Sequence, residues 1–238
     1  MDKSKFNKRV AKVLLSKGYF TAGKLWSPRS KFVPLHPDHR PFFSHPDKMK
    51  IISDEMAKVI SPLKVDLIAS REAGGVPFGM AAALKLKKGF LYLRKEPKGY
   101  GLNSMILGDY KAGQRVAIVD DIVSRAGDKK KAKEILELGG LKVVGVVVIF
   151  DAFLVKFFRE QRWLRESKKY KLISLVRWPD LMKFAAQSNF LGADLCQIIV
   201  EYTRDPLAWQ KKKSNWKKFK ELAAKEKNLV FHESFKDI

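Results

Sequence analysis

Apolar residues recur along the chain with two periods, one typical of helices and one typical of buried strands. Continuous apolar runs bounded by polar residues or glycine predict strands buried on both faces, at 65–69, 89–94, 116–120, 142–150 and 171–176. Apolar residues at helical spacing predict helices at 6–15, 47–60, 77–84, 132–138, 153–165, from 178 onward, 192–202 and 211–227. Residues 19–46 predict a short strand pair and a loop. Strands and helices alternate through the middle of the chain, so we expect an α/β fold with a mainly parallel sheet of five or six strands.

The chain is organised around residues 115–128, where a strand, a short loop and a helix follow one another. Asp120 and Asp121 fall at the carboxyl end of that strand. In open α/β sheets, ligands bind just beyond the carboxyl ends of the strands, and anions bind at helix N-termini. We therefore expect both carboxylates to point toward a substrate. Taken alone, such a pair is also typical of a metal site, a phosphoacceptor or a helix cap, and these interpretations stay open at this point.

Two further segments carry candidate chemistry. Gly74 and Gly75 follow the strand at 65–69 and would let the backbone approach an anion closely, although a tight strand-to-helix turn explains them equally well. Residues 94–110 have no hydrophobic period and carry three cationic residues near their start, Arg94, Lys95 and Lys98. Long segments without regular structure in a compact domain are commonly lids or binding loops, so we expect a mobile, positively charged loop here.

In order and spacing, three stretches resemble the type I phosphoribosyltransferases, and most closely the orotate phosphoribosyltransferases. They are 68–77 with its two glycines, 93–101 with an Arg-Lys-Glu-x-Lys-x-Tyr-Gly loop, and 113–121 with the acidic pair. The resemblance covers residues 15–205 and implies a type I phosphoribosyltransferase-like fold, in which helices flank the central sheet and both chain ends build a small hood. It also implies a glycosyltransferase activity. Such an enzyme joins the phosphoribosyl group of phosphoribosyl pyrophosphate (PRPP) to orotate or a similar base and releases pyrophosphate, in pyrimidine nucleotide synthesis or salvage.

The resemblance assigns roles to individual residues. Asp120 and Asp121 would hold the ribose hydroxyls and, through substrate or water, the cofactor Mg²⁺. Gly74 and Gly75 would bind pyrophosphate through their main chain. The catalytic loop would supply Arg94, Lys95 and Lys98, with Tyr100 at the family's usual histidine position as a further PRPP contact. The 5′-phosphate of PRPP would lie on the loop after the acids, which comprises Ser124, Arg125, Ala126, Gly127 and Asp128.

This chain departs from the family pattern at the 5′-phosphate and at the base. Ala126 adds a methyl group at a close-approach position, and Asp128 could cap the following helix with its side chain and occupy amides that would otherwise bind phosphate. Arg125 could compensate by gripping the phosphate. On the base side, Gly23 stands where the family usually has a lysine, with Lys24 next to it, and Ala152 stands where many orotate enzymes have an arginine.

Charge leaves room for a second function class. The chain has 48 lysines and arginines against 25 aspartates and glutamates, a formal net charge of +23. A basic cleft steers anionic substrates, but a surplus dispersed over the whole chain also suits nucleic acid or another polyanion. Three outcomes therefore stay open: a PRPP enzyme of altered geometry, a PRPP binder without turnover, and a non-catalytic protein that binds nucleic acid or a larger assembly through its basic surface.

The remaining composition bounds location and organisation. Cys196 is the only cysteine and lies in an apolar helical pattern, which predicts a core residue and no disulfide. The longest apolar run, 143–150, is strand-sized, so we expect a cytoplasmic protein without a membrane partner. We divide the chain into a phosphoribosyltransferase-like domain at 1–210, with its core at 47–151 and its hood at 1–46 and 152–210, and a basic helical tail at 211–238. The family's shared catalytic loop implies a homodimer.

Overall fold

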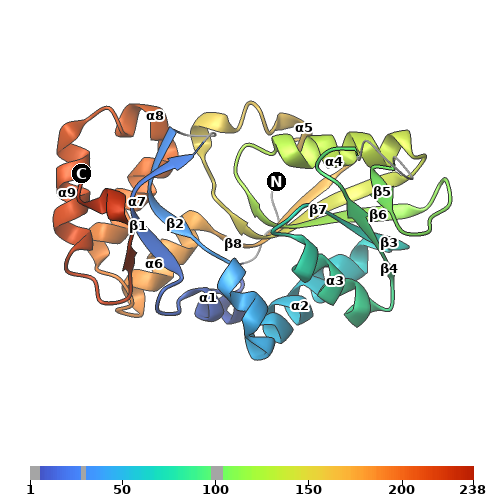
Figure 1. The fold of residues 1–238 in the computed structure, drawn as a ribbon, viewed down its shortest axis with the longest axis horizontal. Helices are drawn as coiled ribbons and strands as arrows, with labels where there is room; N and C mark the ends of the chain where they lie inside the picture. The colour runs from blue at the N-terminus through green and yellow to red at the C-terminus, as the bar shows by residue number, and fades with distance from the viewer. Residues whose placement is uncertain (1–5, 28–30, 98–103) are drawn as a thin grey trace.

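The computed structural model describes residues 6–27, 31–97 and 104–238. Its centre is a six-stranded sheet in the order β5-β4-β3-β6-β7-β8 (Figure 1). All neighbouring strands run parallel except β5, which pairs antiparallel with β4 at the edge. The strands are β3 (Leu67–Arg71), β4 (Gly89–Leu93), β5 (Ile106–Leu107), β6 (Arg115–Val123), β7 (Lys142–Asp151) and β8 (Lys171–Arg177). The α/β fold with a mainly parallel sheet is confirmed.

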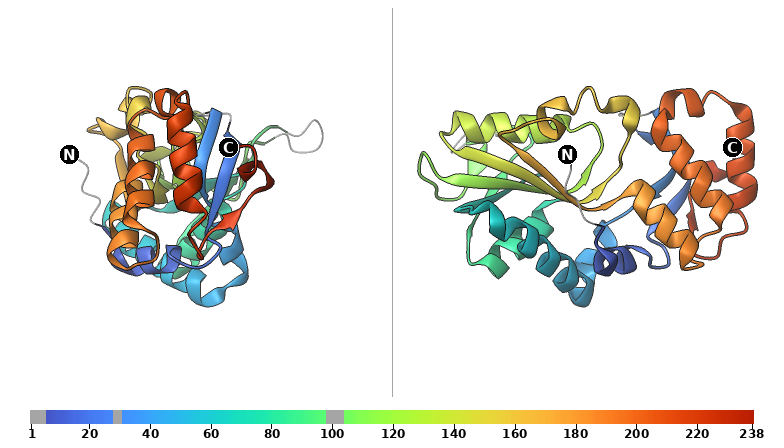
Figure 2. Two further views of the ribbon diagram at one scale, coloured as in Figure 1. Left: turned by 90° about the vertical axis from the view of Figure 1, so that its left-hand side faces the viewer. Right: turned by 180° about the vertical axis from the view of Figure 1, so that it is seen from behind.

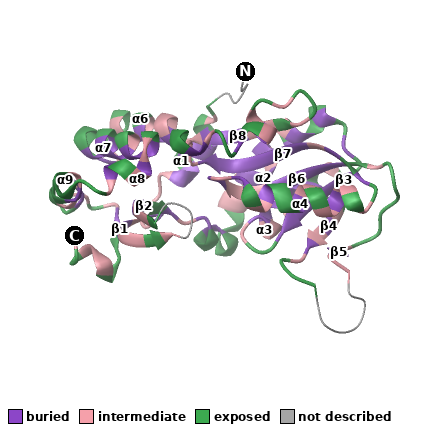
Figure 3. Cartoon of the chain, turned by 90° about the horizontal axis from the view of Figure 1, so that it is seen from above, coloured by how far each residue is buried: buried purple, intermediate pink, exposed green. Residues whose placement is uncertain are grey.

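Helices cover both faces of this sheet, and the alternation of side chains along the strands explains why. Ala117 and Val119 of β6 belong to the core shared with α2 (Pro46–Ile60) and α3 (Val76–Leu86). Val116 and Ile118 of the same strand join the core under α4 (Gly127–Leu138). Successive residues of a strand point to opposite faces, so a continuous apolar run is what a sheet between two helical layers requires (Figure 3).

A second, smaller sheet forms the hood beside the core (Figure 2). In it, β1 (Phe20–Ser27) pairs antiparallel with β2 (Lys31–Pro37), and on its other side parallel with β9 (Val230–Phe231). The hood's helices are α6 (Trp178–Gln187), α7 (Ala193–Arg204), α8 (Pro206–Trp209) and α9 (Lys213–Ala223). Short 3-10 turns lie at Arg40–Ser44, Ser61–Leu63 and Glu233–Phe235. Segments from both ends of the chain therefore build one unit.

The segment 211–238 is packed into this hood. Trp216, Phe219 and Ala223 of α9 are buried in the main hydrophobic core, and the strand β9 that follows is hydrogen-bonded to β1. Lys213, Lys217 and Lys218 of α9 are exposed to solvent, whereas Lys220 donates to the carbonyls of Lys236 and Ile238. The basic helix is therefore docked on the domain, and the domain boundary at residue 210 stays a prediction.

One predicted helix is wrong. Residues 153–165 form a 3-10 turn at Val155–Phe157 and a single helical turn, α5, at Arg162–Arg165. Phe153 has a φ of 47°, a left-handed conformation that no helix interior tolerates. Phe153 and Phe158 of this segment face Arg165, whose guanidinium lies 4.4 Å from the ring centre of Phe158. Leu154, Phe157 and Leu164 are buried in the hydrophobic cores. An irregular segment that buries some apolar residues and places others against a cation thus shows the spacing of a helix.

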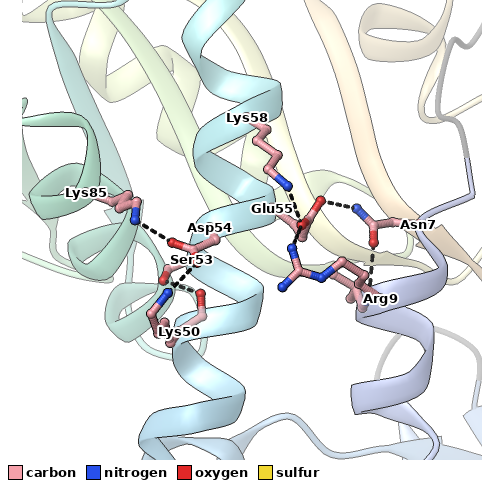
Figure 4. A network of polar contacts seen from close by, with 9 residues as sticks. Asn7, Arg9, Lys50, Ser53, Asp54, Glu55, Lys58 and Lys85 are labelled. Atoms are coloured by element: carbon pink, nitrogen blue, oxygen red, sulfur yellow. Dashed lines mark hydrogen bonds and ion pairs between the residues drawn. The ribbon is translucent and has the colours of Figure 1, made fainter.

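The helix α1 (Lys8–Leu14) is tied to α2 by a buried carboxylate (Figure 4). Glu55 accepts hydrogen bonds from Asn7 at 2.8 Å, Arg9 at 2.8 Å and Lys58 at 2.7 Å. The preceding residue, Asp54, pairs with Lys85 of α3 at 2.8 Å. The two neighbouring acids of α2 thus hold a helix on either side. Within the described part of the chain, none of the helices has the length and hydropathy that crossing a membrane requires.

Candidate active site

The acidic pair lies where the sequence predicts it, at the carboxyl end of β6. Each side chain is held by the backbone amide of the residue that follows it. Asp120 Oδ1 accepts from the amide of Asp121 at 2.9 Å, and Asp121 Oδ1 accepts from the amide of Ile122 at 2.7 Å. One oxygen of Asp121 is thereby left to face the neighbouring loop after β3. Within the described residues, the pair does not cap a helix and is not part of a larger group of potential metal ligands.

The loop after β3 packs directly on these acids. A Cβ atom at Gly74 would lie 2.4 Å from Asp121 Oδ2, and one at Gly75 would lie 2.6 Å from Asp120 Cα. Real Cβ atoms do not come this close to other heavy atoms, so a side chain at either position would push the acids away. A cis peptide joins Glu72 to Ala73 at the start of the same turn. Close approach of the loop to the acids therefore explains both glycines.

Lys129 is a site residue that the sequence analysis missed. It lies on the first turn of α4, its side chain is 5% exposed, and its ammonium pairs with Asp120 Oδ2. Burial raises the pKa of Asp120, and the neighbouring Lys129 ammonium opposes that rise. The only signal in the sequence was a lysine near the start of the helix after the acids. It was not distinguishable there from its exposed neighbours Lys130 and Lys131.

Arg71, at the end of β3, is a second missed residue. Its guanidinium donates to the carbonyl of Lys95 at 2.8 Å and to Asp128 Oδ1 at 3.2 Å, and the residue is only 8% exposed. It therefore joins the start of the catalytic loop to the start of α4. Arg94 Nη1 is buried with no hydrogen-bond partner among the described residues, whereas Lys95 is exposed. Lys98 and Tyr100 lie outside the described residues.

The loop predicted to bind the 5′-phosphate differs from the expectation in two places. Asp128 is the second residue of α4, so its prediction as the N-cap is wrong. The cap position is Ala126, with a left-handed φ of 61°, and Asp128 turns to Arg71 instead. Arg125 donates twice to Glu160, both at 2.6 Å, and stacks 4.7 Å from the ring centre of Phe157. Ser124 is buried at the end of the strand, and Gly127 opens the helix.

The geometry thus joins Gly74, Gly75, Asp120, Asp121 and the N-terminus of α4 at one edge of the sheet. The phosphoribosyl transferase domain family matches residues 43–185 of this chain, more than half of its length. The chain belongs to the phosphoribosyltransferase family.

Named relatives and solved structures agree with this assignment. An orotate phosphoribosyltransferase of Streptococcus agalactiae is 29% identical over 179 residues, which cover 74% of this chain and 84% of the relative. One from Porphyromonas gingivalis is 28% identical with similar coverage, 74% and 83%. Among structures, the UMP synthase of Leishmania donovani has a TM-score of 0.69 at 26% identity, covering 82% of this chain and 41% of that one. The orotate phosphoribosyltransferase of Aeropyrum pernix has a TM-score of 0.64 at 23% identity, covering 75% and 98%, and shares the fold.

This phosphoribosyltransferase has a cavity between its hood and its core, next to the acids. The cavity has a volume of about 120 Å³, several times the roughly 10–15 Å³ that one water needs. Strand β2 lines it with Val33, Leu35 and His36, and the core contributes Ile122, Ser124 and Ala152. Burial lowers the pKa of His36, which favours a neutral imidazole. Lysine and arginine are absent from its lining within the described ranges.

The two departures on the base side have structural explanations. A Cβ atom at Gly23 would lie 3.0 Å from Ser234 Oγ and 3.1 Å from His232 Cβ, so the C-terminal segment occupies the space of a side chain there. The neighbouring Lys24 places its ammonium 5.2 Å from the ring centre of Phe32. Beside Ala152, the buried Asp151 receives a double hydrogen bond from Arg165, at 2.8 and 2.9 Å. The arginine at this strand end comes from α5 instead of the adjacent position.

A buried aromatic cluster supports the floor of the site. The hydroxyl of Tyr19 and His39 Nε2 share a hydrogen bond of 2.9 Å, and both rings pack near Phe42. Burial lowers the pKa of His39 to about 3, and burial followed by the charge of Asp121 raises the pKa of Tyr19 well above its usual range. Both groups are therefore neutral at physiological pH, and the pair ties the residue before β1 to the segment after β2.

The carboxylates of the acidic pair suit a metal ion that also binds substrate oxygens. Asp120 and Asp121 supply carboxylate oxygens, and no group of three or more potential metal ligands occurs in the part of the chain that the structure describes. Mg²⁺ commonly keeps several waters and is held by one or two carboxylates together with substrate phosphates. The residues present fit a metal that arrives with a phosphorylated substrate.

Proposed function

We propose that this phosphoribosyltransferase transfers the phosphoribosyl group of PRPP to orotate or a similar planar base and releases pyrophosphate. The observation that carries the proposal is the packing of the Gly74-Gly75 turn on Asp120 and Asp121, beside the N-terminus of α4. Such an arrangement offers carboxylates to hydroxyl groups and backbone amides to phosphates at one place. The relatives named orotate phosphoribosyltransferase support the choice of base.

Catalysis on such a substrate is mainly electrostatic placement. Leaving of pyrophosphate builds positive charge on the ribose ring and negative charge on the departing group. Asp121 would stabilise the ring cation and hold a ribose hydroxyl, while Arg94 and Lys98 would offset the charge of pyrophosphate. Arg71 is a positioning residue in this scheme, because it fixes the start of the catalytic loop through Lys95. The base would enter the cavity beneath β2, next to Ser124.

Mg²⁺ belongs to this proposal as the cofactor. Asp120 and Asp121 would hold it indirectly, through substrate oxygens and water. When bound, the metal neutralises pyrophosphate oxygens and so assists departure of that group. Placement in the cytoplasm is also part of the proposal, and the single buried thiol of Cys196 agrees with a reducing compartment.

The direct test is pyrophosphate release from Mg-PRPP in the presence of orotate, followed by detection of the nucleotide. We expect turnover with the full chain, and a thermal shift with Mg-PRPP alone, since a ligand at a hundred times its dissociation constant stabilises by about 2.7 kcal/mol. A protein with a Mg-PRPP shift but no nucleotide from a panel of planar bases would be a binder without turnover. Absence of both signals would refute the proposal.

A homodimer that shares its catalytic loops is a further part of the proposal, supported by the Arg-Lys-Glu-x-Lys-x-Tyr-Gly loop. Lys98→Ala should lower kcat more than it raises KM for PRPP, because the group acts on the developing charge of pyrophosphate. If the loop acts across the interface, mixing Lys98→Ala with Asp121→Asn protein should restore about a quarter of wild-type activity through mixed dimers. No gain on mixing would refute the shared loop.

Nucleic-acid binding is a second candidate function, favoured by the charge of +23 and by the exposed lysines of α9. Because α9 is built into the hood, deletion would damage the fold, and charge neutralisation is the better test. Exchange of Lys213, Lys217 and Lys218 for glutamine should flatten the salt dependence of RNA binding, by roughly 0.7 units of slope per lost single-strand phosphate contact. No RNA or DNA binding by the wild-type chain at low salt would exclude this function.

A further inference from the structure

Lys129 differs from the chain's other described lysines in its burial and in its partner. Among the residues that the structure describes, it is the one buried lysine, 4% exposed. It pairs with Asp120, a residue that the proposed function assigns to the substrate. Two other cations near this loop pair with acids to which the proposed function assigns no ribose contact, since Arg125 binds Glu160 and Arg71 binds Asp128.

Helix geometry directs this ammonium toward an anion. In an α-helix the Cα–Cβ bonds tilt toward the N-terminus, so a long side chain on the first turn projects past the helix end. Lys129 is the third residue of α4, and the N-terminal end of that helix carries positive partial charge from its free amides. Its ammonium and these amides therefore act on the same volume, just beyond the end of β6.

Under the proposed function, ribose hydroxyls compete with Lys129 for Asp120. Asp120 Oδ1 already accepts from the amide of Asp121, so the hydroxyls would have to share Oδ2, the oxygen that pairs with the ammonium. A buried ammonium without a partner is strongly unfavourable, so Lys129 then needs another anion. The phosphomonoester of a ribose bound at the acids would lie beside the first turn of α4, and that group offers the required charge.

We infer that Lys129 is a phosphate-binding residue: it holds Asp120 in the free protein and turns to the 5′-phosphate of the substrate when the ribose hydroxyls take Asp120. The inference rests on the proposed function and names a residue outside the loop motif of the family. It also explains how the changed loop serves a phosphate although Arg125 lies on Glu160. The pair with Asp120 keeps the ammonium in place until the substrate binds.

Ribose 5-phosphate without Mg²⁺ is the probe that isolates this contact, because it has the phosphomonoester and lacks pyrophosphate. Calorimetric titration of the full chain should give a dissociation constant that rises about 10-fold or more in Lys129→Met, as loss of a charge-assisted hydrogen bond requires. Lys130→Met, an exposed neighbour on the same helix, removes the same charge and should change the constant less than about 2-fold. Lys129→Arg should recover part of the affinity, and Mg-pyrophosphate binding should not change in any of the three.

A merely structural pair predicts a different result. Lys129→Met leaves Asp120 without its cation and should lower the melting temperature, whereas Asp120→Asn combined with Lys129→Met should recover it. We expect the double variant to bind ribose 5-phosphate more weakly than Asp120→Asn alone, despite its restored stability. Recovery of affinity together with stability, or tighter binding by Lys129→Met, would overturn the inference. Binding of Mg-PRPP but not ribose 5-phosphate by the wild type would also overturn it and leave the proposed function intact, while binding of neither would refute both.

Discussion

The two halves of the candidate cleft differ in how closely they follow the family pattern. The half proposed to bind ribose and pyrophosphate keeps Gly74, Gly75, Asp120 and Asp121 of that pattern and packs them together. The half proposed to bind the 5′-phosphate and the base, with the loop at 124–128 and the cavity beneath β2, departs from the pattern. The acids belong to β6 and the loop at 124–128 follows it directly, so the central sheet does not account for the difference at this loop, whereas β2 belongs to the hood's own sheet.

The departures are matched by partners elsewhere in this chain. Arg125 pairs with Glu160, and Asp128 pairs with Arg71. Next to Ala152, Asp151 pairs with Arg165 of α5. Each partner lies outside the loop motif. A comparison of motifs alone therefore shows only that family residues are missing. The structure shows that the residues present at these positions make contacts with other parts of this chain.

The largest effect should come from the half that follows the pattern. Asp121→Asn removes the charge that would stabilise the ribose cation, so we expect kcat/KM to fall by about 10²–10³. Its backbone contacts stay possible, and the melting temperature should change little. Steady-state rates and thermal unfolding of the same preparation check both statements. A rate within a few-fold of wild type would show that this half is structural.

Gly74→Ala tests the close packing within that half. The added methyl group meets Asp121 Oδ2 at 2.4 Å, so the acid must move, and Mg-PRPP affinity should fall by about 10-fold or more. Gly127→Ala is the matched control from the other half. A Cβ atom there meets nothing within 4 Å, and we expect unchanged affinity. Equal losses from both substitutions would mean that main-chain approach at Gly127 matters as much as packing at Gly74.

The buried His39 should make the free energy of unfolding depend on pH. Its folded pKa of about 3 lies below the usual 6.5, so the unfolded chain binds the proton more readily between these values. Stability is therefore complete above pH 6.5 and declines as the pH falls, by up to about 1.4 kcal/mol per unit. Urea unfolding at pH 7 and pH 5 should show this loss, reduced in His39→Gln. An identical loss in the variant would assign the acid sensitivity to other groups.

The smallest effect concerns the altered half. Ala126 adopts a left-handed φ of 61°, which glycine adopts without strain, so Ala126→Gly should stabilise the protein by about 0.5–1 kcal/mol. Ala132→Gly, buried in the middle of the same helix, should instead destabilise by about 1 kcal/mol. Denaturant midpoints compare the two. Destabilisation by Ala126→Gly would show that the buried methyl group contributes more than the backbone strain costs.

Sequence alone predicted most of the core, because strands between two helical layers have an unmistakable apolar run. The acids and the glycine loop were also predicted, since both lie at strand ends. Lys129 and Arg71 were missed because their roles depend on a pairing across elements that no local pattern records. The helix predicted at 153–165 was wrong for a related reason. The apolar residues of this irregular segment, including two that contact Arg165, have the spacing of a helix.

The loop after the acids marks another limit of sequence reasoning. Aspartate is a good N-cap residue, and Asp128 sits one turn before an apolar period, yet the helix begins at Gly127. The strained Ala126 takes the cap position because the strand end and the helix axis fix where the chain must turn. Residue preference could not reveal that geometry. The outcome for Lys98 and Tyr100 stays a prediction.

The pairing of β1 with β9 has a consequence for how the chain acquires its structure. Thr21 lies opposite Val230, so the hood's sheet joins residues from near the two ends of the sequence. The core strands, in contrast, pair over shorter stretches of chain, the longest of which joins Leu67 of β3 to Val116 of β6. Contacts between distant residues form slowly because a long loop must close first. During synthesis the central sheet can therefore form before β9 has been made. Until residues 230–235 have been added, β1 and β2 lack their third strand, and the β2 wall of the cavity lacks that support.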